Sequence, residues 1–423
     1  MPIRTREWPT WPRSDDKTEE LLLSALRSWQ WTISSCNVGS TPFEMRFAQD
    51  FAHYHGVPYC VPTANGSAAL SVAMQALGVS PGDEVLVPGL TWVACASSVI
   101  YLGGIPVLVD VDPGTLCMSL AAAEAALTPR TKGIMLVHLH CRVADAPAFQ
   151  HLARRRGLFL LEDCSQAHGA EWDARKVGTF GDVGVFSMHQ SKVLTCGEGG
   201  ATVTSDQKLF EAMQQYRADG RKYSGSRPRS GDLELEDAGS VLGRNFCLSE
   251  FQAAILTDRL HYLDAENRQR EDNAMWIESE LERSSMAHGM FRSPHATRKT
   301  YFRLCLRLDT SAFGSHSIEA ITKALSAELR LPVCRVEEPL NAHPLYRPLS
   351  SPIAQMSHSH KDRIDPTTYE LPQSAKAWRE CILLPHNALM GDSHAASDIV
   401  AAFRKVASLH AQLPASKKTG VDQ

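Results

Sequence analysis

A lysine and an aspartate are the residues with the clearest chemistry in this chain. Lys192 lies between two short apolar runs, and a glycine-rich turn, residues 197–200, follows it. Asp163 comes directly after the apolar run 158–162. A lysine amine can hold a carbonyl cofactor as a Schiff base, and a carboxylate can keep a pyridine nitrogen protonated so that the ring accepts electrons. The pair therefore predicts a site for pyridoxal 5'-phosphate (PLP).

A phosphate site and a stacking ring are predicted near the same strand ends. Gly66 and Ser67 open a helix after the strand 59–63, and helix-start N–H groups with a hydroxyl bind anions. Ser187 can reach the same phosphate. Trp92 follows another strand, at the edge where open α/β sheets bind flat ligands. The ordinary alternatives are a helix N-cap for the first motif and a core tryptophan for the second.

The remaining polar candidates also have structural alternatives. Asp163 could simply cap the next segment, and a lone lysine is usually a solvated surface residue. Gln166 could donate to the phenolic oxygen of the cofactor. His168, in the run Gln-Ala-His-Gly-Ala, is more typical of a packed, hydrogen-bonded histidine than of a catalyst. The order of a phosphate site, a ring, a carboxylate and a lysine at successive strand ends is what favours PLP.

Composition excludes several other classes. A net charge of −4 gives no sign of nucleic-acid or membrane binding. No apolar run reaches the roughly 18–20 residues of a membrane span, and the N-terminus lacks a signal peptide's apolar core. The 11 cysteines form no Cys-x-x-Cys pair, so we expect free thiols in a reducing cytoplasm and no metal site. Neither a P-loop nor a dinucleotide fingerprint is present.

The apolar pattern predicts an α/β fold. Seven short strands are expected over residues 59–63, 84–88, 106–111, 133–139, 158–162, 183–188 and 201–204. Helices are expected between most of them, which indicates a largely parallel sheet covered on both faces.

The length of 423 residues favours two domains. We expect residues 1–270 to form a large cofactor-binding domain with an N-terminal arm, and residues 271–423 a smaller α+β domain. Long loops are expected over residues 224–239 and 350–368. The polar tail after residue 413 is expected to be frayed.

The chain resembles the DegT/DnrJ/EryC1/StrS sugar aminotransferases, which have the aspartate aminotransferase fold (PLP fold type I). Matching motifs run from about residue 40 to about residue 410. They include Asn-Gly-Ser-Ala-Ala-Leu, Glu-Asp-Cys-Ser-Gln-Ala-His-Gly-Ala, and Gly-Arg-Asn-Phe-Cys-Leu-Ser-Glu-Phe-Gln. Within the group, His-Gln-Ser-Lys-Val-Leu-Thr-Cys-Gly-Glu-Gly-Gly is most similar to the L-glutamine:scyllo-inosose and 2-deoxy-scyllo-inosose aminotransferases of aminoglycoside biosynthesis.

The resemblance implies a role for each matching residue. Lys192 forms the Schiff base and moves the proton between the two imine carbons, and Asp163 pairs with the pyridinium nitrogen. The cofactor alternates with its pyridoxamine form as an amino group moves from L-glutamine to a keto-cyclitol or keto-sugar. The implied cofactor contacts are Gly66, Ser67, Trp92, Gln166 and Ser187, with Asn245 reaching the phosphate from the partner in a homodimer.

Two departures from the family pattern bear on the substrate. Cys247 replaces a frequent arginine, and His140-Cys141 replaces the usual Tyr-Gly. Three alternatives stay open: a nucleotide-sugar aminotransferase, another PLP reaction such as sugar dehydration, and a non-catalytic protein of the same fold. Lys192 argues against the dehydratases, which carry histidine there, and retention of Lys192 and Asp163 argues against a binding protein.

Overall fold

The computed structural model describes residues 1–35, 39–224, 230–314, 316–355 and 358–410. The helices are α1 (Asp16–Arg27), α2 (Phe43–His55), α3 (Gly66–Ala76), α4 (Ala94–Tyr101), α5 (Leu120–Ala125), α6 (Ala146–Arg156), α7 (Gln207–Arg217), α8 (Glu250–Arg259), α9 (Leu263–Arg283), α10 (Ile318–Leu329), α11 (His358–Arg363), α12 (Pro372–Glu380) and α13 (Ser393–His410). Within these ranges, no helix combines the length and the apolar composition that a membrane span requires.

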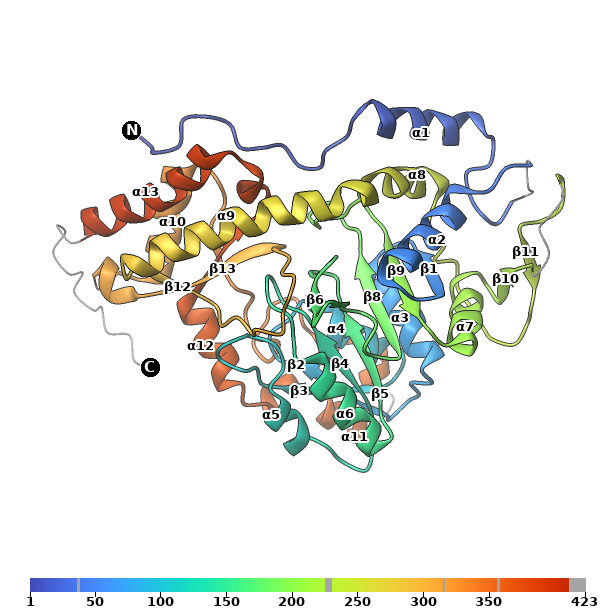
Figure 1. Cartoon of the computed structure of the whole chain (residues 1–423). Helices are drawn as coiled ribbons and strands as arrows, with labels where there is room; N and C mark the ends of the chain where they lie inside the picture. The colour runs from blue at the N-terminus through green and yellow to red at the C-terminus, as the bar shows by residue number, and fades with distance from the viewer. Residues whose placement is uncertain (36–38, 225–229, 315, 356–357, 411–423) are drawn as a thin grey trace.

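A seven-stranded sheet occupies the centre of the molecule (Figure 1). Its order is β1-β9-β8-β5-β4-β2-β3, from β1 (Tyr59–Thr63), β2 (Glu84–Pro88), β3 (Ile105–Val109), β4 (Thr131–Val137), β5 (Phe159–Asp163), β8 (Val183–Ser187) and β9 (Gly200–Thr204). Strand β9 runs antiparallel to both of its neighbours, and the pairs from β8 to β3 are parallel. The predicted strand set and the mostly parallel sheet are confirmed.

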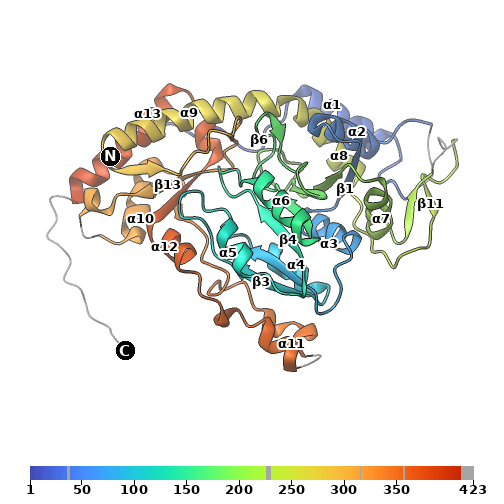
Figure 2. The same ribbon diagram turned by 60° about the horizontal axis from the view of Figure 1, so that its bottom comes forward.

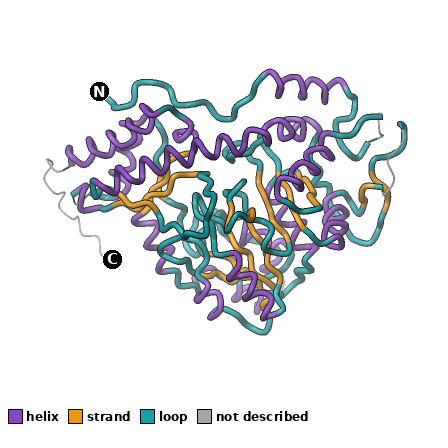
Figure 3. Tube along the Cα trace, viewed as in Figure 1, coloured by secondary structure: helices purple, strands orange, loops and turns teal. Residues whose placement is uncertain are grey.

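Helices cover this sheet because its strands are apolar on both faces. Helix α6 packs on β4 and β5, and α3 packs on β5, β8 and β9. Figure 2 shows α6 in front of the sheet, and Figure 3 shows the strands enclosed by helices. Helix α3 begins where the Asn65 side chain accepts a hydrogen bond from Ala68 N–H, and α6 ends at Gly157, whose φ of 66° is easily adopted by glycine.

A smaller antiparallel sheet follows in the chain. Its order is β12-β13-β15-β14, from β12 (Ala287–Gly289), β13 (Arg303–Leu308), β14 (Cys334–Arg335) and β15 (Cys381–Pro385). Helix α9 packs on β12, and α10 and α13 pack on each other. The N-terminal arm reaches this part of the molecule, because Trp8 Nε1 donates to Leu329 O (2.7 Å) and Ile3 N–H donates to Glu328 Oε2 (2.9 Å). The division at residue 270 stays a prediction, and α9 runs through it.

Both predicted long loops contain regular structure. Strand β11 (Leu235–Asp237) pairs with β10 (Arg221–Tyr223), although residues 225–229 lie outside the described ranges. The second segment contains α11, and Arg363 joins it to β2 through an ion pair with Glu84 (2.6 Å). Long-range pairs of this kind produce no periodic pattern of apolar residues within the segment itself. For that reason the sequence of both segments predicts a loop. The polar tail after residue 413 lies outside the described residues.

Several elements were not predicted. They are α7, α12, β10, β12, β14, β15 and the short hairpin β6 (Glu171–Trp172) with β7 (Arg175–Lys176). Strand β15 is a short apolar run whose state depends on its partners β13 and β14, so its sequence does not distinguish a strand from the end of a helix.

Candidate active site

A cavity of about 530 Å³ opens where β5 and β8 end. Parallel strands bring their carboxyl ends to one edge of a sheet, and that edge is where open α/β folds bind ligands. The predicted residues that line the cavity are Gly66, Ser67, Trp92, Asp163, Gln166, Ser187 and Lys192. Residues that are far apart in the sequence therefore meet in one site, as predicted.

Asp163 lies at the end of β5, only 5% exposed. Its Oδ1 accepts a hydrogen bond from Ser165 N–H (2.9 Å), and its Oδ2 accepts one from the Cys95 thiol (3.2 Å). Ser165 N–H and the Cys95 thiol therefore fix the orientation of the carboxylate. No cationic group of the described residues forms an ion pair with Asp163, so its charge is available to a ligand.

Lys192 sits half-buried on the turn after β8. Its Nζ lies 4.1 Å from the centre of the Phe302 ring. Burial lowers the pKa of Lys192 to about 8, although Asp163 and Glu337 act in the opposite direction. A lysine with this pKa loses its proton more readily near neutral pH than an ordinary lysine does, which favours its use as an amine nucleophile or base.

The turn that carries Lys192 is held from outside the sheet. Trp11 Nε1 lies 3.1 Å from the carbonyl oxygens of both Gln190 and Lys192, and donates to them. His386 Nε2 lies 3.2 Å from Ser191 O, and its ring meets Trp11 edge-on at 4.6 Å. The N-terminal arm and the segment after β15 thus fix the backbone of the turn.

Gly66 and Ser187 form a tight backbone cradle at one end of the cavity. A Cβ atom added to Gly66 would lie 2.6 Å from Ser187 Cβ, closer than real side chains approach. Ser67, which follows at the start of α3, is exposed toward the cavity. Backbone N–H groups at a helix start and two hydroxyls suit a phosphate.

Gln166 is oriented by its neighbour across the sheet edge. Its Oε1 accepts a hydrogen bond from His140 N–H (2.7 Å), which leaves the amide nitrogen as a donor in a residue that lines the cavity. The His140 ring lies 3.1 Å from Glu337 Oε2. Burial opposes ionisation of Glu337, but His140 and Arg303 outweigh it and lower the pKa of this carboxyl to about 2.

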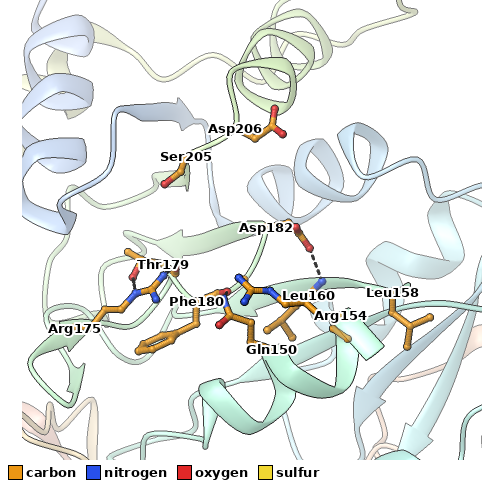
Figure 4. A pocket seen from close by; sticks show the side chains of 12 residues that line it. Gln150, Arg154, Leu158, Leu160, Arg175, Thr179, Phe180, Asp182, Ser205 and Asp206 are labelled. Atoms are coloured by element: carbon orange, nitrogen blue, oxygen red, sulfur yellow. Dashed lines mark hydrogen bonds between the residues drawn. The ribbon is translucent and has the colours of Figure 1, made fainter. Parts of the chain in front are cut away.

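A second depression of about 380 Å³ lies at the opposite ends of the same strands (Figure 4). Its polar groups largely bind one another. Asp182 Oδ2 accepts a hydrogen bond from Leu160 N–H (2.8 Å), Arg175 Nε donates to Thr179 Oγ1 (3.0 Å), and the Asp206 side chain caps α7.

Comparison with known proteins agrees with this geometry. Residues 24–404 match the DegT/DnrJ/EryC1/StrS aminotransferase family. The L-glutamine:2-deoxy-scyllo-inosose aminotransferase of Streptomyces kanamyceticus is 45% identical, covering 98% of this chain and 97% of the relative. The L-glutamine:scyllo-inosose aminotransferase of Streptomyces griseus is 43% identical, covering 96% and 95%.

The chain belongs to the DegT/DnrJ/EryC1/StrS aminotransferase family. It is a PLP-dependent aminotransferase of fold type I. Among solved structures, 3-amino-5-hydroxybenzoic acid synthase superimposes with a TM-score of 0.82 at 26% identity, covering 96% of this chain and 100% of the synthase. Streptomyces venezuelae DesV, in complex with a ketimine intermediate, gives 0.76 at 28% identity, covering 92% and 94%.

The residues of this family member fit PLP. The Gly66–Ser187 cradle leaves no space for a side chain, and the N–H groups of the helix start with the Ser67 and Ser187 hydroxyls suit an anion. At the other side of the cavity, Lys192 and the Asp163 carboxylate offer the amine and the anion that a pyridinium aldehyde needs. Trp92, 50% exposed, presents its indole to the cavity.

Some predicted residues lie elsewhere in the aminotransferase. Asn245 is exposed outside the cavity of its own chain, so its predicted contact with a partner's phosphate stays a prediction. His168 is fully buried against Phe186, and burial lowers its pKa to about 3, as the packed alternative expects. Cys247 packs with Tyr223 and not in the cavity, whereas His140 reaches the cavity through Gln166 and Glu337.

Among the cavity residues that were not predicted are Cys95, Phe302, Arg303 and Glu337. Arg303 begins β13 directly after Phe302, and Glu337 follows β14, so all three lie in or next to the smaller sheet. The local signals are a Phe-Arg pair at the start of an apolar strand and an acidic pair at residues 337–338. Neither signal by itself indicates a binding site.

One cluster has metal-ligating residue types, namely His138, Glu162 and Cys164. Its groups already bind protein atoms. His138 lies 3.1 Å from Glu162 Oε2, and the Glu162 carboxylate accepts hydrogen bonds from Gly178 N–H (2.9 Å) and Gly181 N–H (2.7 Å). This buried network supports the strand end that carries Asp163.

Proposed function

We propose that this enzyme transfers the amino group of L-glutamine to the ketone of a cyclitol, 2-deoxy-scyllo-inosose or scyllo-inosose. Relatives bearing these names are 42–45% identical over nearly the whole chain. The observation that carries the proposal is the single cavity that joins Lys192, Asp163 and the Gly66–Ser187 cradle.

In the proposed mechanism, Lys192 transfers a proton and Asp163 pairs with the cofactor ring. Bound PLP supplies an electron sink that stabilises negative charge on the carbon that loses a proton. Lys192 Nζ takes that proton and returns it to the neighbouring carbon, and its pKa of about 8 suits both directions of transfer. Asp163, held by Ser165 N–H and the Cys95 thiol, would pair with the ring nitrogen and keep it protonated.

Further residues bind and orient. Gln166 donates its amide N–H to the ring oxygen, with its carbonyl fixed by His140 N–H. Gly66, Ser67 and Ser187 would hold the phosphate, and Trp92 would stack on the ring. All of these residues line the cavity, which supports these roles.

The charge of the cavity favours a neutral polyol over a nucleotide sugar as acceptor. The acidic side chains Asp163, Glu198 and Glu337 line it together with Lys192, Arg303 and His189. A diphosphate would require an excess of basic groups, which this lining lacks.

The proposed assembly is a homodimer in which Asn245 completes the partner's phosphate site. Asn245 is exposed, and its backbone forms an isolated bridge with Ala218. Light scattering of the purified protein gives the mass, and Asn245→Ala should weaken cofactor retention if the site is shared.

The test is the visible absorption spectrum of the purified protein before and after L-glutamine. We expect a band from lysine-bound PLP that bleaches with L-glutamine and returns with 2-deoxy-scyllo-inosose or scyllo-inosose. A band that L-glutamine leaves unchanged would contradict the proposed donor. Recovery with keto-sugar nucleotides but not with keto-cyclitols would contradict the proposed acceptor.

A further inference from the structure

One cation of the cavity has no assigned task. Arg303 begins β13 and projects into the cavity wall. No carboxylate of the described residues lies within ion-pair distance of its guanidinium, its buried Nε has no hydrogen-bond partner, and its Nη1 lies 3.6 Å from Cys334 Sγ. A guanidinium in this state is able to receive an anion.

Arg303 lies beside Lys192 across one aromatic ring. The Arg303 guanidinium carbon is 5.3 Å from the centre of the Phe302 ring, and Lys192 Nζ is 4.1 Å from the same centre. Phe302 is held in place because its N–H donates to His140 O (3.0 Å). The amine that reacts and the guanidinium therefore both contact the Phe302 ring.

A side cavity of about 330 Å³ adjoins the active cavity at this point. The two cavities share His189, Ser191, Phe302 and Arg303, and the side cavity extends to Trp11 and Asn387. Arg303 thus borders both cavities.

The two substrates of the reaction differ in charge. An α-amino acid carries a carboxylate on the carbon that bears its amine, whereas a keto-cyclitol is neutral. A carboxylate entering a cavity that already contains Asp163 and Glu337 is unfavourable unless a cation pairs with it. Glu337 already pairs with His140, 3.1 Å away, so Arg303 remains available to the incoming carboxylate.

We propose that Arg303 binds the α-carboxylate of the amino donor, with the side cavity receiving the rest of that molecule. This inference rests on the proposed function, since it assumes an α-amino acid donor. The donor is then recognised by a residue of the smaller sheet. The neutral acceptor is bound by the polar groups around Gln166 and Glu337.

The test compares Arg303→Met and Arg303→Lys with Arg307→Met. Arg307 lies on the same strand but faces Glu380, with its Nε 3.5 Å from the carboxylate, so it is a matched control. Each half-reaction is followed separately by absorbance. The donors are L-glutamine and 4-aminobutanamide, which is glutamine without its α-carboxylate, and the acceptor is the keto-cyclitol.

Arg303→Met should raise the KM for L-glutamine about 30- to 100-fold, the loss expected for a desolvated charge pair. The preference for L-glutamine over 4-aminobutanamide should fall by the same factor, and the acceptor half-reaction should change less than about threefold. Arg303→Lys should retain part of the preference. Calorimetry with 2-methyl-L-glutamine, which lacks the proton to be removed, should show the same loss of affinity without any turnover.

Equal losses in both half-reactions would overturn the proposal, because they would mean that Arg303 acts through Glu337 on the whole cavity. An unchanged donor preference would also overturn it. The wild type could fail to react with L-glutamine but react with another α-amino acid. The proposed donor would then be wrong, and the same comparison made with that amino acid would still test the role of Arg303. If no α-amino acid reacts, both proposals fail.

Discussion

Strands β5 and β8 each have two ends, and the two ends differ in how their polar groups are used. At the carboxyl ends, Asp163 and Lys192 face a cavity and have no ion-pair partner among the described residues. At the amino ends, Asp182 accepts from Leu160 N–H and Arg175 donates to Thr179 (Figure 4). Both ends are hollowed, but the cavity at the carboxyl ends brings together a buried carboxylate and a lysine amine whose pKa is lowered, whereas the charged groups at the amino ends bind backbone and hydroxyl groups or lie exposed.

The difference teaches that a depression becomes a site through unsatisfied groups. Groups that already bind one another gain little from a ligand, because a ligand must replace bonds that exist. Groups left unpaired in a partly buried cavity have already lost part of their hydration. A ligand that pairs with them offsets that free-energy cost. Each prediction below separates these two situations.

Replacing the lysine of the cavity should have the largest effect. Lys192→Ala should lower kcat/KM by at least about 10³-fold, because proton transfer at the reacting carbons loses its base. The apoprotein should unfold at the same or a higher temperature at pH 7, since burial disfavours the charged form of this lysine.

Lys176→Ala is the matched control for that variant. Lys176 also lies 4.1 Å from the centre of an aromatic ring, that of Tyr54, but it pairs with Glu171 (3.1 Å) and lies outside the cavity. Its kcat/KM should stay within about twofold. A comparable loss in both variants would mean that any buried lysine matters and would remove the distinction.

The next effect should come from closing the phosphate cradle. Gly66→Ala places a Cβ 2.6 Å from Ser187 Cβ, so the backbone must shift where the phosphate is expected. We expect cofactor affinity to fall about 10- to 100-fold, the result of an overpacking cost of about 1–3 kcal/mol, measured by titration of the apoenzyme with PLP. Gly114→Ala, whose Cβ meets nothing closer than 3.1 Å, should bind PLP normally; weakened binding there would point to general destabilisation.

A smaller effect should appear in the pH dependence of cofactor attachment. The lowered pKa of Lys192 means that its amine is protonated and unreactive below about pH 8 and neutral above it. The rate at which apoenzyme attaches PLP should therefore rise with pH through a midpoint near 8. Asp163→Asn should move the midpoint downward, because the Asp163 charge favours the ammonium form.

Asp182→Asn serves as the control at the other end of the strands. The Asp182 carboxylate binds Leu160 N–H far from the lysine, so the midpoint should not move. A midpoint near 10.5 in the wild type, the ordinary value for lysine, would contradict the role of burial in tuning Lys192.

The smallest effect is expected in the depression of Figure 4. Arg154 is exposed on its rim, at the end of α6. Arg154→Ala should leave kcat/KM unchanged and alter the free energy of unfolding by less than about 0.5 kcal/mol, measured by urea denaturation. A selective loss of activity with normal stability would show that this depression also serves function.

Much of the molecule follows from the sequence alone. The apolar runs that end in Asp163 and Ser187 predict strands, and Gly66 after β1 predicts a helix start. Because parallel strands align their ends, these residues were bound to meet. The fold class, the cofactor and the main cavity residues could therefore be predicted from local patterns.

The tertiary structure decided what local patterns do not encode. Phe302, Arg303 and Glu337 enter the cavity from the smaller sheet, and Trp11 reaches the lysine turn from the N-terminal arm. Segment 358–363 became a helix against β2 where its composition indicated a loop. The physical reason is that periodicity reports which face of an element is buried, whereas the partner that buries it depends on contacts between residues that are hundreds of positions apart in the chain.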